Sequence, residues 1–185
     1  MTLSVWIIGG LVLLAALLVI GMYNSLVRGR YQVREGFSGI DVQLKRRHDL
    51  IPNLIETVQG YADFEKGVLA DVTRLRTAAM SDDSLQDRER DENALSAALK
   101  TLFAVAENYP DLKANASFLD LQNDLSEIES NIQSARRYYN ATVRDYNIRV
   151  ESFPSNIVAG MFGFQREPFF ELDTAEERKV PKVEF

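Results

Sequence analysis

The chain offers few of the side chains from which active sites and metal centres are commonly built. It has one His and no Cys, which excludes thiolate metal sites and disulfides and leaves little for His-based triads or zinc sites. A di-iron or di-manganese centre in a helix bundle needs two Glu-x-x-His motifs. His48 has Lys45, not Glu, three residues before it, and is typical of an ordinary residue near a helix end. We therefore expect no catalytic residue, no metal and no cofactor.

Carboxylates gather on one later segment of the chain. Asp120, Asp124 and Glu127 share a helical face, and Glu129 lies close by. They flank an apolar seam, as the solvated positions of an amphipathic helix do. The alternative is a divalent cation held by this face, and with it an enzyme that works with carboxylates alone.

Two polar sets, rich in Arg and Asn, interrupt the apolar pattern. The first set, around Pro52, comprises Arg46, Arg47, Asp49 and Asn53. The second comprises Arg136, Arg137, Asn140, Arg144, Asp145 and Asn147. Helical spacing puts Arg137, Asn140 and Arg144 on one face. Such side chains either tie helix ends and loops together or dock a partner or an anionic lipid. On the docking alternative the contact residues are Arg46, Arg47, Arg137, Asn140 and Arg144.

The segment from Leu3 to Met22 contains no charged residue, and Ser4 is its only polar side chain. About 20 apolar residues, at about 1.5 Å each, cover the hydrocarbon core of a bilayer. Trp6 and Tyr23 stand near the two ends, where interfacial aromatic residues belong. A signal peptide would carry a Lys or Arg before the apolar run and a better cleavage site after it. We expect an uncleaved transmembrane helix.

The charges beside this segment predict its orientation. Arg28, Arg30 and Arg34 follow it, and no Lys or Arg precedes it. The positive-inside rule then places the N-terminus outside and the rest of the chain in the cytoplasm. Arg28 and Arg30 are also candidate contacts for anionic lipid headgroups.

Beyond the apolar segment, apolar residues recur at steps of three and four, as in helices that pack side by side in coiled coils. The segments with this pattern are 33–44, 54–79, 95–106 and 118–153. Capping residues in Met80–Ser84 and the Tyr109-Pro110 pair separate them, and Asn115 or Ser117 caps the last. Pro52 marks either a turn, at which the second helix begins, or a kink in one long helix. The sequence predicts an all-α fold: a transmembrane helix and an antiparallel, up-down-up-down four-helix bundle with a long last helix.

The predicted organisation is an anchor at 1–22, a helical bundle at 23–154 and a tail at 155–185. The tail opens on the apolar run IVAGMFGF, from Ile157 to Phe164, and closes on charged residues. The apolar run is too short to span a membrane. It packs on its own bundle, on the lipid surface or on a neighbouring subunit, and its candidate contact residues are Met161, Phe162 and Phe164.

Several stretches in sequence order resemble the LemA family. They are Gln43-Leu-Lys-Arg-Arg47, Asp49-Leu-Ile-Pro-Asn-Leu54, Tyr109-Pro-Asp-Leu-Lys-Ala-Asn115, Phe118-Leu-Asp-Leu-Gln122, Arg136-Arg-Tyr-Tyr-Asn140, Asp145-Tyr-Asn147 and Phe153-Pro-Ser-Asn156. The resemblance covers Tyr23 to Phe170. It implies an N-terminal membrane helix followed by a helical bundle, in a bacterial inner membrane. It implies no catalytic residues, because the family has no established activity.

The sequence thus favours a non-enzymatic, membrane-anchored scaffold or adaptor that assembles with itself or docks a membrane-associated partner. The alternative is an accessory subunit that regulates a membrane enzyme such as a protease or transporter. The expected partners are the lipid bilayer, further copies of the chain and a membrane protein. The net charge of −6 argues against nucleic acid, which attracts basic surfaces.

Overall fold

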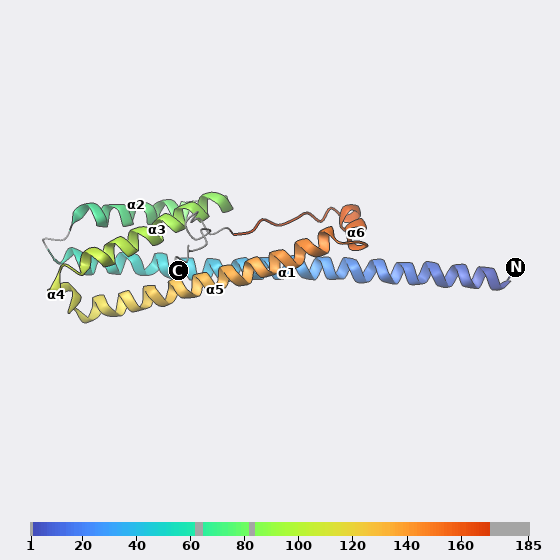
Figure 1. Ribbon diagram of the computed structural model, residues 1–185, viewed down its shortest axis with the longest axis horizontal. Coiled ribbons are helices and arrows are strands. Elements are labelled where there is room, and N and C mark those ends of the chain that lie inside the picture. The colour runs from blue at the N-terminus through green and yellow to red at the C-terminus, as the bar shows by residue number, and fades with distance from the viewer. Residues whose placement is uncertain (1, 62–64, 82–83, 171–185) are drawn as a thin grey trace, which may run out of the picture. The chain divides into compact units, whose positions relative to one another are not determined.

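The computed structural model describes residues 2–61, 65–81 and 84–170 (Figure 1). Every regular element in these residues is a helix, which confirms the all-α class. The helices are α1 Thr2–Gln59, α2 Lys66–Ser81, α3 Leu85–Ala106, α4 Pro110–Lys113, α5 Ala116–Glu151 and α6 Ser155–Phe162. The charged end of the tail, 171–185, lies outside the described residues.

Of the two alternatives at Pro52, the structure has the long helix, because α1 continues through it. A proline inside a helix leaves the carbonyl four residues earlier without its N–H donor. That carbonyl belongs to His48, and Arg76 Nε of α2 donates a hydrogen bond to it over 2.8 Å. A side chain from another helix therefore replaces the donor that the proline lacks.

The helix that was expected over 54–79 is divided in two. Its first part is the end of α1, and its second part is α2, which begins at Lys66. Glu65, expected as a polar member of one continuous seam, precedes α2 and is exposed. Gly60 follows the last residue of α1, and glycine is among the poorest helix formers because it loses the most backbone freedom.

Three other predicted helix ends are confirmed. Ser84 precedes α3 and its Oγ accepts the backbone N–H of Asp87 over 3.1 Å. The α3 helix ends before Pro110, which opens the short α4. Asn115, rather than Ser117, caps α5, since its Oδ1 accepts the backbone N–H of Phe118 over 3.1 Å.

The chain forms two compact units. The terminal unit comprises Met1–Ile40 and Ala135–Phe169, and the central unit comprises Asp41–Ser134 and Phe170–Phe185. Parts of α1 and of α5 belong to each unit.

In the central unit, five helices contribute to one apolar core. Its buried members are Ile51, Leu54, Val58, Leu69, Val72, Ala79, Leu95, Leu99, Leu102, Ala106, Leu112, Phe118 and Leu125. Within the longer helices they recur at steps of three, four or seven residues, so each of these helices turns one stripe inward. The rings of Phe103 and Phe118 meet edge to face, with centroids 6.1 Å apart. This core fixes the polar groups described below.

In the terminal unit, glycines allow α1 and α5 to approach closely. A Cβ on Gly29 would lie 3.0 Å from the ring of Tyr146, and one on Gly36 would lie 3.2 Å from Tyr139 Cα. The two glycines are seven residues apart, as are the two tyrosines. The helices therefore run antiparallel here, in a register that repeats every two turns.

The apolar start of α1 is the only helix in the described residues that is long and apolar enough to cross a membrane. No residue of this apolar stretch is buried. Burial in the helix begins at Leu26 and recurs at Val33 and Ile40, on the side that faces α5. One exposed apolar N-terminal helix, as the sequence predicts, is therefore present.

Candidate functional site

A buried arginine joins three helices of the central unit. Arg47 of α1 is 1% exposed. Its Nη1 donates to Ser96 Oγ over 2.6 Å and to Glu129 Oε2 over 2.8 Å. Its Nη2 donates to the Glu92 carboxylate, and Ser96 Oγ donates to Glu129 Oε2 over 3.1 Å. We call Arg47, His48, Glu92, Ser96 and Glu129 the buried charge cluster.

His48 completes the cluster on the other oxygen of Glu92. His48 Nε2 lies 2.9 Å from Glu92 Oε1. Burial raises the pKa of the Glu92 carboxyl, but the hydrogen bond from His48 and the charge of Arg47 outweigh burial. The pKa of Glu92 is therefore lowered from its usual value of 4.5. Glu92 is a carboxylate at neutral pH and balances the buried charge of Arg47.

This arrangement is suited to holding helices together. Both carboxylates accept from the Arg47 guanidinium, and a buried charge that is paired in this way avoids the large desolvation cost of a single one. In the part of the chain that the structure describes, no three His, Asp or Glu side chains are grouped so as to hold a metal ion.

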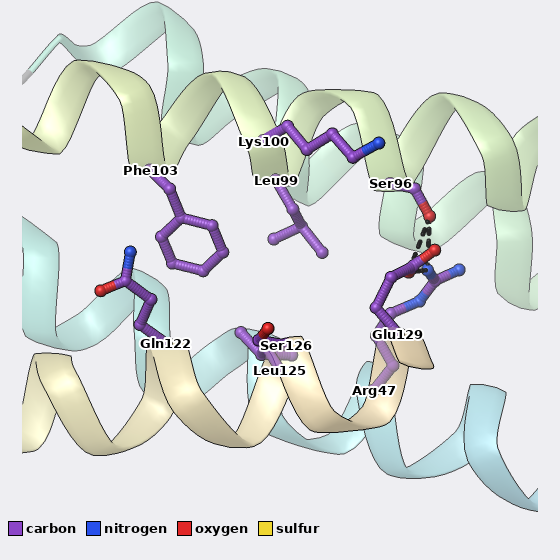
Figure 2. Close-up of a pocket in the computed structure, with 9 residues that line it drawn as sticks. All are labelled: Arg47, Ser96, Leu99, Lys100, Phe103, Gln122, Leu125, Ser126 and Glu129. Atoms are coloured by element: carbon purple, nitrogen blue, oxygen red, sulfur yellow. Dashed lines mark hydrogen bonds and ion pairs between the residues drawn. The ribbon is translucent and has the colours of Figure 1, made fainter. Parts of the chain in front are cut away.

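A pocket of about 240 Å³ opens beside the cluster, between α3 and α5 (Figure 2). Its lining residues are Arg47, Ser96, Leu99, Lys100, Phe103, Gln122, Leu125, Ser126 and Glu129. Figure 2 shows Phe103 and Gln122 at one end and the Arg47 contacts at the other. Pockets for whole cofactors usually measure about 300–1,000 Å³. This one fits a group the size of an apolar side chain, with polar groups at its edge.

A second hollow, of about 310 Å³, lies on the His48 side of Glu92. It is lined by Asp41, Leu44, Lys45, His48, Asp49, Ala79, Met80, Arg88 and Glu92. Arg88 Nη1 lies 2.6 Å from Asp41 Oδ1, and Lys45 Nζ lies 3.0 Å from Asp49 Oδ2. The charged residues of this hollow thus pair largely with one another.

The adjacent candidates Arg46 and Arg47 have opposite environments. Arg46 is exposed, whereas Arg47 is the centre of the buried cluster. On α5, Asp120, Asp124 and Glu127 are exposed, as solvated positions should be. Glu129, grouped with them in the sequence, is half-buried and pairs with Arg47.

The candidates on the later part of α5 belong to the terminal unit. Arg137 and Arg144 are exposed and Asn140 is half-buried. Arg144 Nη2 pairs with the neighbouring Asp145 carboxylate over 3.1 Å. Asn147, from the same polar set, makes a two-way contact with the segment after α6. Its Nδ2 donates to the Glu167 carbonyl, and its Oδ1 accepts the backbone N–H of Glu167, each over 2.9 Å.

The lipid-contact candidates separate by exposure. Arg28, Met161 and Phe162 are exposed. Phe164 is buried, and the guanidinium of the half-buried Arg30 lies 5.1 Å from the centre of its ring. Arg30 and Phe164 thus stabilise the terminal unit, while the other three face outward.

Sequence reasoning missed Glu92 and Ser96. The third apolar segment begins at Leu95, but its spacing continues backward to Glu92 and Glu89, which are buried. A glutamate in register with an apolar seam is the signal, because a buried carboxylate needs a partner cation. Nothing in the sequence says that this cation is Arg47. His48, expected near a helix end, lies within α1 beside Glu92.

The family model described as LemA family matches residues 36–185. The chain belongs to the LemA family. The LemA-family chain is 26% identical over 169 residues to "Protein LemA" of Metamycoplasma hominis, covering 89% of this chain and 76% of that protein. It is 23% identical over 184 residues to "Magnetosome protein MamQ 2" of Paramagnetospirillum magneticum, covering 85% and 68%.

A further relative is "Magnetosome protein MamQ" of Magnetospirillum gryphiswaldense, at 22% identity over 184 residues. The names of the two MamQ proteins place them with magnetosomes. For the LemA-family chain, these relatives and the exposed apolar part of α1 are compatible with a membrane location.

Proposed function

We propose that this LemA-family chain is a membrane-anchored, non-enzymatic scaffold or adaptor. The observation that carries the proposal is the change in exposure along α1. The apolar stretch at the start of α1 is wholly exposed, whereas later residues of the same helix, such as Leu26 and Leu54, are fully buried. An exposed apolar stretch of this length is stable inside a bilayer and unfavourable in water. The same helix thus serves as anchor and as part of a packed core.

The buried charge cluster supports a role without catalysis. The guanidinium of Arg47 and the two carboxylates beside it are used on one another. Catalytic groups, by contrast, face a substrate with a proton to give or take. The pocket between α3 and α5 supplies the adaptor with a receptacle for an apolar side chain of a partner.

The central unit, on this proposal, is an antiparallel four-helix bundle made from the end of α1, α2, α3 and the start of α5. The shared apolar core and the short breaks between these helices support it. The unit faces the cytoplasm of a bacterial cell, with the N-terminus across the inner membrane, as the arginines after the apolar segment favour.

Self-assembly is part of the proposal, but the length of α5 does not argue for it. The later part of α5 packs on α1 of the same chain at Gly29 and Gly36. The pocket between α3 and α5 is the contact surface that the proposal assigns to a second copy or to a membrane protein.

A photo-crosslinking side chain at Ser126, on the pocket rim, tests the adaptor role in intact cells. The matched control is Ser130, which is exposed one turn further along α5. Capture of one defined protein in stoichiometric amount from Ser126 and not from Ser130 supports the proposal, and its mass distinguishes a second copy from another protein. A membrane enzyme that loses activity when the chain is deleted would make the chain its regulatory subunit. Equal, diffuse crosslinking from both positions would contradict docking at the pocket.

Orientation is tested with the Cys-free chain and one introduced cysteine. Thr101→Cys suits this purpose, because Thr101 is exposed on α3. Ser84, in the preceding break, is less suitable, because its side chain caps α3. Labelling by a membrane-impermeant maleimide only after the inner membrane is permeabilised is the expected result. Labelling when only the outer barrier is opened would reverse the orientation.

A further inference from the structure

Four exposed apolar side chains lie in and beside α6, and two of them, Phe153 and Met161, are the most exposed large apolar side chains described outside the N-terminal part of α1. Phe153 is 81% exposed, Ile157 56%, Met161 72% and Phe162 54%. Ile157 and Met161 are four residues apart and so share a helical face. We call these four residues the α6 patch. Soluble surfaces carry single apolar residues, whereas a group of this kind marks a contact surface.

The position of α6 is fixed by Tyr23 of α1. The Tyr23 and Phe162 rings meet edge to face with centroids 4.8 Å apart, and Phe164 lies 5.7 Å from the same ring. Tyr23 directly follows Met22, the last residue of the apolar segment. Figure 1 shows α6 beside α1 where α1 continues without a neighbour toward its N-terminus. Whatever surrounds the end of the apolar segment therefore also surrounds α6.

The chemistry of the segment fits the boundary of a bilayer. Residues 152–165 contain no charged side chain. Glu151 and Arg166, on either side of this stretch, pair with each other over 3.1 Å. Aromatic residues and short amphipathic helices favour the depth between headgroups and acyl chains, where an apolar side can be buried and a polar backbone end satisfied.

Two arginines lie in the terminal unit where they could meet the lipid headgroups. A hollow of about 540 Å³ in the same unit is lined by Gly21, Asn24, Ser25, Arg28, Gln32 and Arg149. It contains two guanidinium groups and no carboxylate. Arg149 Nη1 donates to the Ser25 carbonyl over 3.3 Å. Arg28 is exposed, and the described residues give it no ion pair. A lipid phosphate is the anion expected at this level.

We propose that α6 is a second membrane contact, which inserts Phe153, Ile157, Met161 and Phe162 shallowly into the bilayer that holds α1. This inference rests on the proposed anchor and extends it. The chain would meet the membrane at two places, a helix that crosses the bilayer and a short helix that lies in the bilayer surface. A second copy of the chain is the rival occupant, and it would leave the continuity with Tyr23 unexplained.

Depth-dependent quenching tests the contact in the full-length protein. Met161→Cys and Ile157→Cys, each labelled with an environment-sensitive fluorophore, are placed in vesicles of phosphatidylethanolamine and phosphatidylglycerol. Both labels should show blue-shifted emission and should lose more intensity to lipids that carry a quencher near the headgroup than to lipids quenched near the chain end. Leu13→Cys, within the apolar segment, should show the reverse order, and Thr101→Cys should show neither effect.

The other outcomes separate this inference from the anchor. If Leu13→Cys is quenched but both α6 positions behave as Thr101→Cys does, the α6 contact is wrong and the anchor stands. If the α6 labels are blue-shifted without quenching by lipid, protein covers the patch and the inference is wrong. If Leu13→Cys is not quenched at either depth, the anchor fails and the α6 contact fails with it.

Discussion

At the scale of the residue, Arg47 shows how much a helical core can depend on one charge. Both terminal nitrogens of its guanidinium are engaged, and they reach α3 and α5. Removing one member of a buried ion pair leaves the other charge buried without a partner. This destabilises the fold far more than the loss of an exposed charge does. Its neighbour Arg46 is exposed and provides a matched control.

Arg47→Met should lower the free energy of unfolding by about 3–5 kcal/mol, because the buried Glu92 carboxylate loses its guanidinium partner. Arg46→Met should change it by no more than about 0.5 kcal/mol, as exposed substitutions usually do. Denaturant titration of both variants in the same detergent measures the difference. Equal effects would mean that the cluster contributes little to stability.

Glu92 should make stability depend on pH on the acid side. Its pKa in the folded protein is lowered from 4.5 by His48 and Arg47, despite the opposing effect of burial. Above pH 4.5 both the folded and the unfolded chains hold the carboxylate, so its full contribution is present. As the pH falls below 4.5, the unfolded state takes up the proton first, and this contribution is lost.

Unfolding free energies from neutral pH downward should therefore fall less steeply below pH 4.5 in Glu92→Gln than in the parent chain. Asp124→Asn, an exposed change on α5, should keep the parent's pH dependence. The same slope in the parent and in Glu92→Gln would show that Glu92 is not the titrating group.

At the scale of the element, local pattern predicted much of the helix layout and missed what distant side chains decide. The end of α3 before Pro110 and the cap at Asn115 follow from local rules, and both are confirmed. Pro52 does not end α1, because Arg76 satisfies the carbonyl that the proline leaves without a donor. A rule that considers one segment at a time cannot identify a partner on another helix. The buried charge cluster was missed for the same reason, since the partners of Arg47 come from α3 and α5.

A double-mutant cycle tests the link between Pro52 and Arg76. Arg76→Met should cost about 1.5–3 kcal/mol, because the His48 carbonyl loses a charged donor. In a Pro52→Ala background, residue 52 regains an N–H that can donate to the His48 carbonyl. The destabilisation caused by Arg76→Met should therefore be clearly smaller in this background. Arg74→Met, on the same helix but exposed, is the control and should cost little in either background. Identical costs of Arg76→Met in both backgrounds would disprove the coupling.

Two glycines of α1 offer a matched pair for helix packing. A Cβ at Gly36 would lie 3.2 Å from the Tyr139 backbone, whereas at Gly39 it would meet nothing within 4 Å. Gly36→Ala should destabilise the terminal unit by about 1–3 kcal/mol, since α5 must move away. Gly39→Ala should stabilise α1 by about 1 kcal/mol, because alanine loses less freedom in a helix. Thermal unfolding in one detergent compares them, and the same sign for both would contradict the close approach.

At the scale of the whole molecule, the apolar segment and the α6 patch predict different strengths of membrane attachment. Deletion of residues 2–22 should move the chain from the membrane to the soluble fraction after washing, because a shallow patch alone binds weakly and reversibly. Met161→Asp in the full chain should leave it in the membrane fraction. Firm retention of the deleted chain would show that a second segment is sufficient as an anchor.

The two units also differ in how the chain is threaded through them. The described part of the central unit is nearly continuous in sequence, from Asp41 to Ser134, while the terminal unit joins two stretches from the ends of the chain. Tyr139 leaves the ribosome about 100 residues after Gly36, which at roughly 5–20 residues per second is a delay of about 5–20 s. During that interval the first stretch has no α5 to pair with. The close contacts of Gly29 and Gly36 with α5 can therefore form only after residues 41–134 have been synthesised.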